Sequence, residues 1–161
     1  MKRTPFYNIH RQLGAKLVEF GGFEMPVQYR GIIEEHRTVR STVGVFDVSH
    51  MGEFEVWGSG AAEFVQRATV NDVTKLSEGR AQYSAMCYDD GGIVDDLLAY
   101  HFGDHYMLVV NAANIEKDFS WLKDHVSSDV DLRNVSDEVA LLAVQGPKSL
   151  ETLQMLTSVD L

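Results

Sequence analysis

The strongest constraint on the fold is a series of tight turns between strand-like segments in the middle of the chain. Residues 81–88 and 93–102 are rich in apolar and aromatic residues, and Asp89-Asp90-Gly91-Gly92 between them has the composition of a hairpin turn. A second turn at Gly103-Asp104 leads into another strand-like segment, 106–110. Strands joined by such short turns run antiparallel, so the sequence predicts a three-stranded meander.

Helices and further strands are predicted on both sides of this meander. Helical spacing or flanking Gly and Pro residues indicate helices over 4–13, 31–43, 60–68, 111–126 and 147–156, and strands are expected over 16–20, 53–57, 130–135 and 139–144. Because groups of strands with tight turns are mixed with helices, the predicted fold class is α+β, with mixed or antiparallel sheets and helices packed on them.

Five local predictions depend on a few side chains. Thr4 is expected to cap the first helix, with Pro5 at its first position, and Asn111 is expected to cap the helix over 111–126. The alternation of residues 53–57 predicts a half-buried strand. The helix over 31–43 carries Ile32, Ile33, His36, Val39 and Arg40 at helical spacing, and the helix over 60–68 carries Ala61, Phe64, Val65 and Ala68 on one face.

Composition excludes several classes of protein. The 161 residues fit one domain or parts of two, and the net charge of -10 disfavours nucleic acid and anionic membranes as partners. No apolar run approaches the roughly 20 residues of a membrane span, and neither a secretory signal nor a mitochondrial presequence is recognisable at the start. The single cysteine, Cys87, precludes an internal disulfide, so the cytoplasm is the expected location.

Asp95 and Asp96 are the leading candidates for a functional site. They lie next to each other on a predicted strand, so they point to opposite faces, Asp95 with Ile93 and Leu97 and Asp96 with Leu98. Both faces are otherwise apolar, and one aspartate is therefore expected to point toward the interior. A structural pairing with a backbone N–H or a cation, and a functional site, both remain open at this point.

Other reactive residue types give weaker signals. His50 follows Asp47 by three residues, an arrangement that suits a base held by a carboxylate, but a turn histidine bonded to a local carbonyl is the favoured interpretation. Cys87 is interpreted as a small buried hydrophobe. None of the six histidines has the spacing of zinc ligands, and no metal site is predicted.

Seven short segments together resemble one known family. They are RTP (3–5), LGAK (13–16), GFEMPVQY (22–29), VFDVSHMGE (45–53), GGIVDDLL (91–98), NAANIEKD (111–118) and AVQGP (143–147). In this order they are similar to the N-terminal part of the T-protein family of the glycine cleavage system, the tetrahydrofolate-dependent aminomethyltransferases. The resemblance covers nearly the whole chain.

The resemblance implies a fold and a division into domains. Family members are longer and have three domains around a central folate pocket. By this resemblance, residues 1–52 are the N-terminal piece of the first domain, 53–135 belong to the second, and 136–161 return toward the first. The chain is then an N-terminal fragment of that folate-binding fold, without the third domain. Because the first two domains of the family pack against chain beyond Leu161, the isolated chain is expected to self-associate and to lack activity.

The resemblance also implies a reaction in glycine catabolism and one-carbon metabolism. The family takes an aminomethyl group from the lipoyl arm of the H-protein, releases ammonia and forms 5,10-methylene-tetrahydrofolate. Asp96 matches the key aspartate of the family, which would act as the catalytic residue and bind folate. The positions that match the lining of the folate pocket are Met51, Tyr83, Tyr100, Val110 and Asn111.

Two alternatives share the fold. Related folate-dependent enzymes demethylate dimethylglycine, sarcosine or dimethylsulfoniopropionate, and folate-binding assembly factors for iron–sulfur proteins are not enzymes. The segments Glu24-Met25-Pro26 and Val48-Ser49-His50-Met51 favour the T-protein over both.

Overall fold

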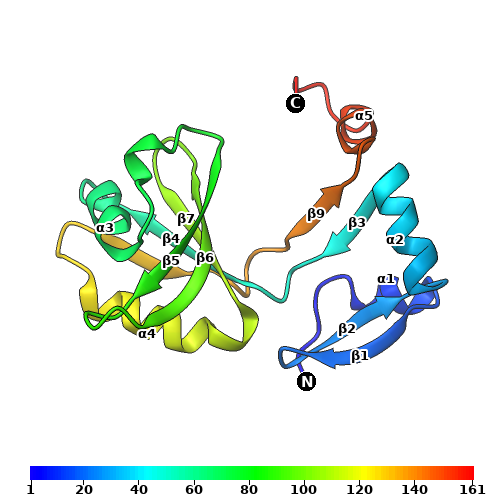
Figure 1. The fold of residues 1–161 in the computed structure, drawn as a ribbon, viewed down its shortest axis with the longest axis horizontal. Helices are drawn as coiled ribbons and strands as arrows, with labels where there is room; N and C mark the ends of the chain where they lie inside the picture. The colour runs from blue at the N-terminus through cyan, green and yellow to red at the C-terminus, as the bar shows by residue number, and fades with distance from the viewer. The chain divides into compact units, whose positions relative to one another are not determined.

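The computed structural model describes residues 1–161, which form two compact units (Figure 1). Unit 1 comprises Met1–His50 and Ala140–Leu161, and unit 2 comprises Met51–Val139. The division lies within a few residues of the predicted domain boundaries at 52/53 and 135/136, whose relation to the domains of a larger protein stays a prediction. None of the helices is long and apolar enough to cross a membrane.

Unit 2 is built on a five-stranded antiparallel sheet in the order β5-β6-β7-β4-β8. Its elements are β4 (Gly52–Trp57), α3 (Ala61–Ala68), the 3-10 helix η1 (Val73–Lys75), β5 (Ala81–Cys87), β6 (Ile93–His101), β7 (Tyr106–Val110), the 3-10 helix η2 (Ala112–Asn114), α4 (Ile115–His125) and β8 (Asp131–Asn134). Strands β5, β6 and β7 pair in chain order, which confirms the predicted meander.

The two faces of this sheet have different environments. One face, which includes Phe54, Ala99 and Leu108, packs with α3 and with Leu122 of α4 in the hydrophobic core (Figure 1). We call it the helix-covered face. Side chains at the alternate positions point the other way, and on this second face Tyr83, Leu98, Val109 and Glu53 form one row across β5, β6, β7 and β4. We call it the open face, because Tyr83 at one end of this row is exposed, whereas Val109 and Glu53 at the other end are buried.

Unit 1 contains two separate two-stranded antiparallel sheets, β1-β2 and β3-β9. Its elements are α1 (Tyr7–Gln12), β1 (Lys16–Phe20), β2 (Phe23–Gln28), α2 (Ile32–Ser41), β3 (Gly44–Asp47), β9 (Leu142–Gln145) and α5 (Ser149–Gln154). Strand β9 pairs with β3, so the C-terminal segment completes a sheet that begins near the N-terminus.

Unit 1 buries very little apolar surface. Tyr7 and Met25 are its only buried hydrophobic residues, and every other one belongs to unit 2. The helix predicted over 31–43 forms as α2, but none of its residues is buried, and Ile33 is 69% exposed. Helical spacing predicts which side chains share a face, but it does not predict whether another element covers that face.

Three of the local predictions were wrong. Thr4 does not cap α1, which begins at Tyr7; its hydroxyl instead donates a hydrogen bond to Asp47 Oδ2 at 2.6 Å. Asn111 makes no capping hydrogen bond. Strand β4 is not half-buried, since Glu53 is 0% exposed. Thr4 and Asn111 instead bond to acids that are distant in the sequence, Asp47 and Asp96 respectively.

The exposed apolar surface of unit 1 leads to a prediction about association. We expect the 161-residue chain to self-associate as its concentration rises, because burying this surface between copies removes it from water. Analytical ultracentrifugation measures the effect. Ile33→Lys should reduce association, whereas Ile93→Lys in unit 2, at a position equally exposed at 69%, should leave it unchanged. A chain that stays monomeric at every concentration contradicts this expectation.

Candidate functional site

Asp96 and Tyr83 form a hydrogen-bonded pair on the open face of unit 2. Asp96 lies on β6, and Tyr83 lies on the neighbouring strand β5, opposite Leu98. The two side chains are thus diagonal neighbours on one face. The Tyr83 hydroxyl donates to Asp96 Oδ2 at 2.6 Å, and this bond raises the pKa of the tyrosine because it stabilises the neutral phenol. The Tyr83 side chain is 63% exposed, so its ring is accessible.

Asn111 connects both aspartates. It lies directly after β7, and its Nδ2 atom is 3.1 Å from Asp95 Oδ1 and 3.1 Å from Asp96 Oδ1. A carboxylate only accepts hydrogen bonds, so the amide N–H groups of Asn111 donate to both acids. The predicted candidates Tyr83, Asp96 and Asn111 therefore meet in one hydrogen-bonded group.

Asp95 lies on the helix-covered face and is the aspartate that points inward. It is buried, as expected for one of the two acids, and its two carboxyl oxygens accept from Asn111 Nδ2 at 3.1 and 3.2 Å. Burial raises the pKa of the Asp95 carboxyl. Hydrogen bonds with Asp118, Asn114 and Asn111 act the other way and hold that pKa below its ordinary value.

Asp118 and its neighbour Lys117 were missed by the sequence analysis. Burial and the nearby Asp95 carboxyl raise the pKa of Asp118 to about 7. Lys117 Nζ lies 3.6 Å from Asp118 Oδ1 and donates to the backbone oxygen of Val94 at 2.5 Å. One sequence signal was present, since Asp118 lies four positions before the buried Leu122 and so shares the apolar face of α4.

A bulge in β6 changes the predicted sharing of faces. Met86 pairs with Asp95 but the next residue of β5, Cys87, pairs with Ile93, so one residue of β6 is skipped. As a result Val94 and Asp95 are both buried and Ile93 is 69% exposed, which corrects the prediction that Ile93 shares a face with Asp95. Bulges often occur beside functional sites, where they redirect side chains.

The other predicted pocket residues lie apart from this hydrogen-bonded group. Tyr100 is half-buried on the same open face, opposite Met107. Met51 is half-buried directly before β4. Val110 is fully buried in the core, opposite Leu97 on the helix-covered face, so its side chain is turned away from Asp96.

Glu53 is an acid on the open face that sequence reasoning also missed. It is 0% exposed, and neither of its carboxyl oxygens has a hydrogen-bond partner. Burial raises its pKa to about 7. Its backbone is held by Ser136, whose hydroxyl oxygen accepts from Glu53 N at 3.0 Å.

Comparison with known proteins identifies the family and the fold of this chain. The GCVT N-terminal domain family matches residues 6–161. The chain belongs to this family. The antiparallel α+β fold is likewise confirmed, because the crystal structure of glycine cleavage system aminomethyltransferase T from Bartonella henselae superimposes with a TM-score of 0.89 at 35% identity, over 96% of this chain and 43% of that one.

Two curated relatives show how much of a GCVT protein the chain represents. An aminomethyltransferase of Chloroherpeton thalassium is 62% identical over 100% of this chain, which covers 45% of that protein. An aminomethyltransferase of Bacillus subtilis is 53% identical over 99% of this chain, which covers 44% of that protein. The chain thus spans less than half of the length of the relatives it matches.

Unit 1 of this GCVT domain holds a second polar network. His10 contacts Asp47 Oδ2 through Nε2 and the Tyr29 hydroxyl through Nδ1, each at 2.8 Å. Burial raises the pKa of Asp47, but hydrogen bonds from His10, Thr4 and Ser49 outweigh burial and lower it. Asp47 therefore pairs with His10. The alternative interpretation of the sequence required a pair between Asp47 and His50, which the structure does not contain.

His50 has a different role from either predicted one. Its Nδ1 atom is buried without a hydrogen-bond partner, and its ring lies against Phe20 and Phe23. Burial lowers its pKa, against the opposing charge of Asp47. The favoured interpretation, a bond to a local carbonyl, was therefore wrong, because aromatic rings surround this imidazole.

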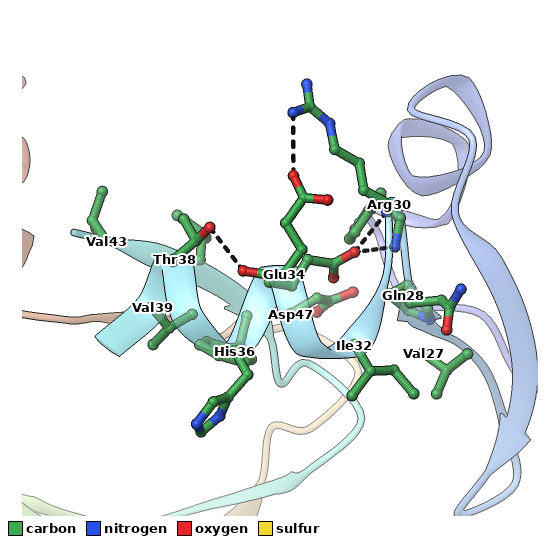
Figure 2. Close-up of a pocket in the computed structure, with 16 residues that line it drawn as sticks. Val27, Gln28, Arg30, Ile32, Glu34, His36, Thr38, Val39, Val43 and Asp47 are labelled. Carbon is green, nitrogen blue, oxygen red and sulfur yellow. Dashed lines mark hydrogen bonds and ion pairs between the residues drawn. The ribbon is translucent and has the colours of Figure 1, made fainter. Parts of the chain in front are cut away.

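Unit 1 also contains a cavity of about 590 Å³ between α2 and strands β2 and β3 (Figure 2). Apolar side chains such as Ile32, Val39 and Val43 line much of it. At its rim Arg30 and Glu34 form an exposed ion pair. No sequence signal pointed to this cavity.

Proposed function

We propose that this chain is the N-terminal part of a tetrahydrofolate-dependent aminomethyltransferase of glycine cleavage. The observation that carries the proposal is the group formed by Asp96, Tyr83 and Asn111, in which a carboxylate is held on an accessible sheet face. Its oxygens accept from Tyr83 at 2.6 Å and from Asn111 at 3.1 Å. The curated relatives, whose name is aminomethyltransferase, support the same reaction.

The three side chains suit a reduced folate. Tetrahydrofolate, when bound, supplies the nitrogen atoms that accept the one-carbon unit. The Asp96 carboxylate would stabilise the positive charge that develops during transfer, since it is already oriented and needs no reorganisation. The exposed ring of Tyr83 offers a flat apolar wall, and Asn111 positions the carboxylate and contributes amide groups near the polar edge of the ligand.

The donor and the location are part of the same proposal. We infer that the aminomethyl group arrives on the lipoyl arm of the H-protein, as the resemblance to the T-protein family implies. The similar structure from Bartonella henselae, 35% identical, is named an aminomethyltransferase of the glycine cleavage system, which is consistent with this donor. The net charge of -10 supports a partner other than nucleic acid or an anionic membrane. The cytoplasm remains the proposed location.

A chimera tests the function. Residues 1–161 replace the aligned segment of the Bacillus subtilis relative, which is 53% identical, and formation of 5,10-methylene-tetrahydrofolate from glycine is followed with the other glycine cleavage proteins present. Turnover close to that of the unmodified relative supports the proposal. A folded chimera without turnover contradicts it.

Two variants of the chimera test the pocket. Tyr83→Ala and Asn111→Ala should reduce the thermal shift that tetrahydrofolate produces, because each removes a contact from the bound state. Tyr88→Ala is the matched control, since Tyr88 is another exposed tyrosine near the end of the same hairpin but makes no hydrogen bond to Asp96. Thermal shifts that stay unchanged in both test variants would remove these residues from the pocket.

A further inference from the structure

The side-chain amide of Asn111 is held in one orientation by two acids. Its Nδ2 atom lies 3.1 and 3.2 Å from the two carboxyl oxygens of Asp95, 3.1 Å from Asp96 Oδ1 and 3.3 Å from the backbone oxygen of Asp96. All four of these oxygens accept hydrogen bonds, and in an amide only the nitrogen donates. Turning the amide over would place its oxygen against two carboxylates, so the acids exclude that orientation.

The strand pairing explains how one amide reaches acids on opposite faces of the sheet. The ladder between β6 and β7 ends with Leu97 opposite Val110, so Asn111 is the first residue after it. The next position of β6 is Asp96, which points to the open face, and its neighbour Asp95 points to the helix-covered face. The Asn111 side chain therefore lies where the ladder stops, within hydrogen-bond distance of both acids.

The two hydrogen bonds that hold the Asp96 carboxyl differ in how firmly they are anchored. Oδ2 accepts from the Tyr83 hydroxyl at 2.6 Å, but the Tyr83 side chain is 63% exposed, so little packing holds it in place. Oδ1 accepts from Asn111, which is half-buried and is bonded in turn to Asp95, only 8% exposed. Of these four side chains, Asp95 is the one that the core holds in place, and packed supporting residues are what keep a functional group in position.

We propose that Asp95 is a positioning residue, which holds the Asn111 amide so that one N–H group points at Asp96 and fixes its carboxylate. Asp95 lies on the helix-covered face and acts on Asp96 through Asn111. A carboxylate suits this role, since a hydrogen bond to an ionised acceptor is roughly twice as strong as one to a neutral acceptor. The effect on catalysis rests on the proposed function, whereas the hydrogen-bonded arrangement itself does not.

Side-chain amide NMR on the 161-residue chain tests the arrangement without folate or catalysis. Asp95→Asn makes the acceptor neutral, so one Asn111 amide proton should shift upfield, and Asp96→Asn should shift the other. Asp95→Ala removes the acceptor, and the order parameter of the Asn111 side chain should fall from about 0.85 to below about 0.6.

Val56→Ala is the control for lost stability. Val56 is buried at the opposite end of the β4–β7 ladder from Asn111, so its truncation should destabilise the chain and leave the Asn111 signals in place. Asn111 signals that stay unchanged in the Asp95 variants would overturn the proposal. If Asp95→Ala fails to fold, the upfield shift in Asp95→Asn still decides the question.

A double-mutant cycle in the chimera separates positioning from simple structural support. Asp95→Asn alone should lower kcat by about 10- to 100-fold, because a catalytic group that is slightly misplaced slows the reaction. In the Asn111→Ala background the same substitution should have no further effect on kcat, since Asp95 acts through Asn111. Equal effects in both backgrounds would overturn the proposal. A chimera without turnover contradicts the proposed function instead, and the NMR experiment then decides whether Asp95 holds Asn111.

Discussion

Replacing Asp96 with asparagine in the chimera is expected to lower turnover by about 100- to 1000-fold. Asparagine keeps the shape of the side chain but removes the charge that would stabilise the transferring group. The melting temperature should change little, because Asp96 is only half-buried and its partner Tyr83 is exposed. A coupled assay for 5,10-methylene-tetrahydrofolate, with thermal unfolding of the same samples, measures both quantities.

Asp95→Asn is the matched comparison. Asp95 is buried on the helix-covered face and accepts from Asn111 through both carboxyl oxygens, so its substitution should lower the melting temperature more than Asp96→Asn does. Near-normal turnover in Asp96→Asn together with loss of turnover in Asp95→Asn would show that the catalytic role belongs to the other aspartate of the pair.

Glu53→Gln is expected to flatten the dependence of stability on pH. The pKa of Glu53 rises from 4.5 to about 7 on folding. The folded state therefore holds a proton that the unfolded state releases between these values. The contribution of Glu53 to the free energy of unfolding is complete below pH 4.5 and is lost as the pH rises to about 7, a difference of about 3 kcal/mol. The substituted amide carries no such proton, so its contribution is constant.

Urea unfolding between about pH 5 and pH 8 measures this effect. Tryptophan fluorescence reports unit 2 alone, since Trp57 and Trp121 are the only two tryptophans and both lie in it. Asp118 contributes a slope of the same sign, so Glu53→Gln should remove part of the total. An unchanged slope in Glu53→Gln would show that Glu53 ionises normally.

Prediction from sequence succeeded where neighbours along the chain decide the structure. The meander formed as predicted because its turn at 89–92 brings adjacent strands together without help from distant residues. The helix over 60–68 formed as α3, and Ala61, Phe64, Val65 and Ala68 are all buried as its spacing indicated. The same periodicity in α2 produced a helix but no burial.

Residue types, and the match to positions of the T-protein family, predicted Asp96, Tyr83 and Asn111 as site residues. They did not predict the hydrogen bonds that join these three side chains. The alternation of strand side chains required that one aspartate point inward, and Asp95 does so. Periodicity did not indicate the bulge at Val94, because a bulge depends on how β6 pairs with β5. It also gave no sign that Asn111 contacts both acids.

The sequence by itself therefore determined the local elements, the α+β class and the identity of the acids on β6. Only the tertiary structure decided which carboxyl groups are buried. Glu53 and Asp118 lie in segments that are ordinary by pattern, yet both are 0% exposed. The free energy of a buried carboxyl depends on the cover, donors and charges that distant segments bring to it, and a pattern of neighbouring residues contains none of that information.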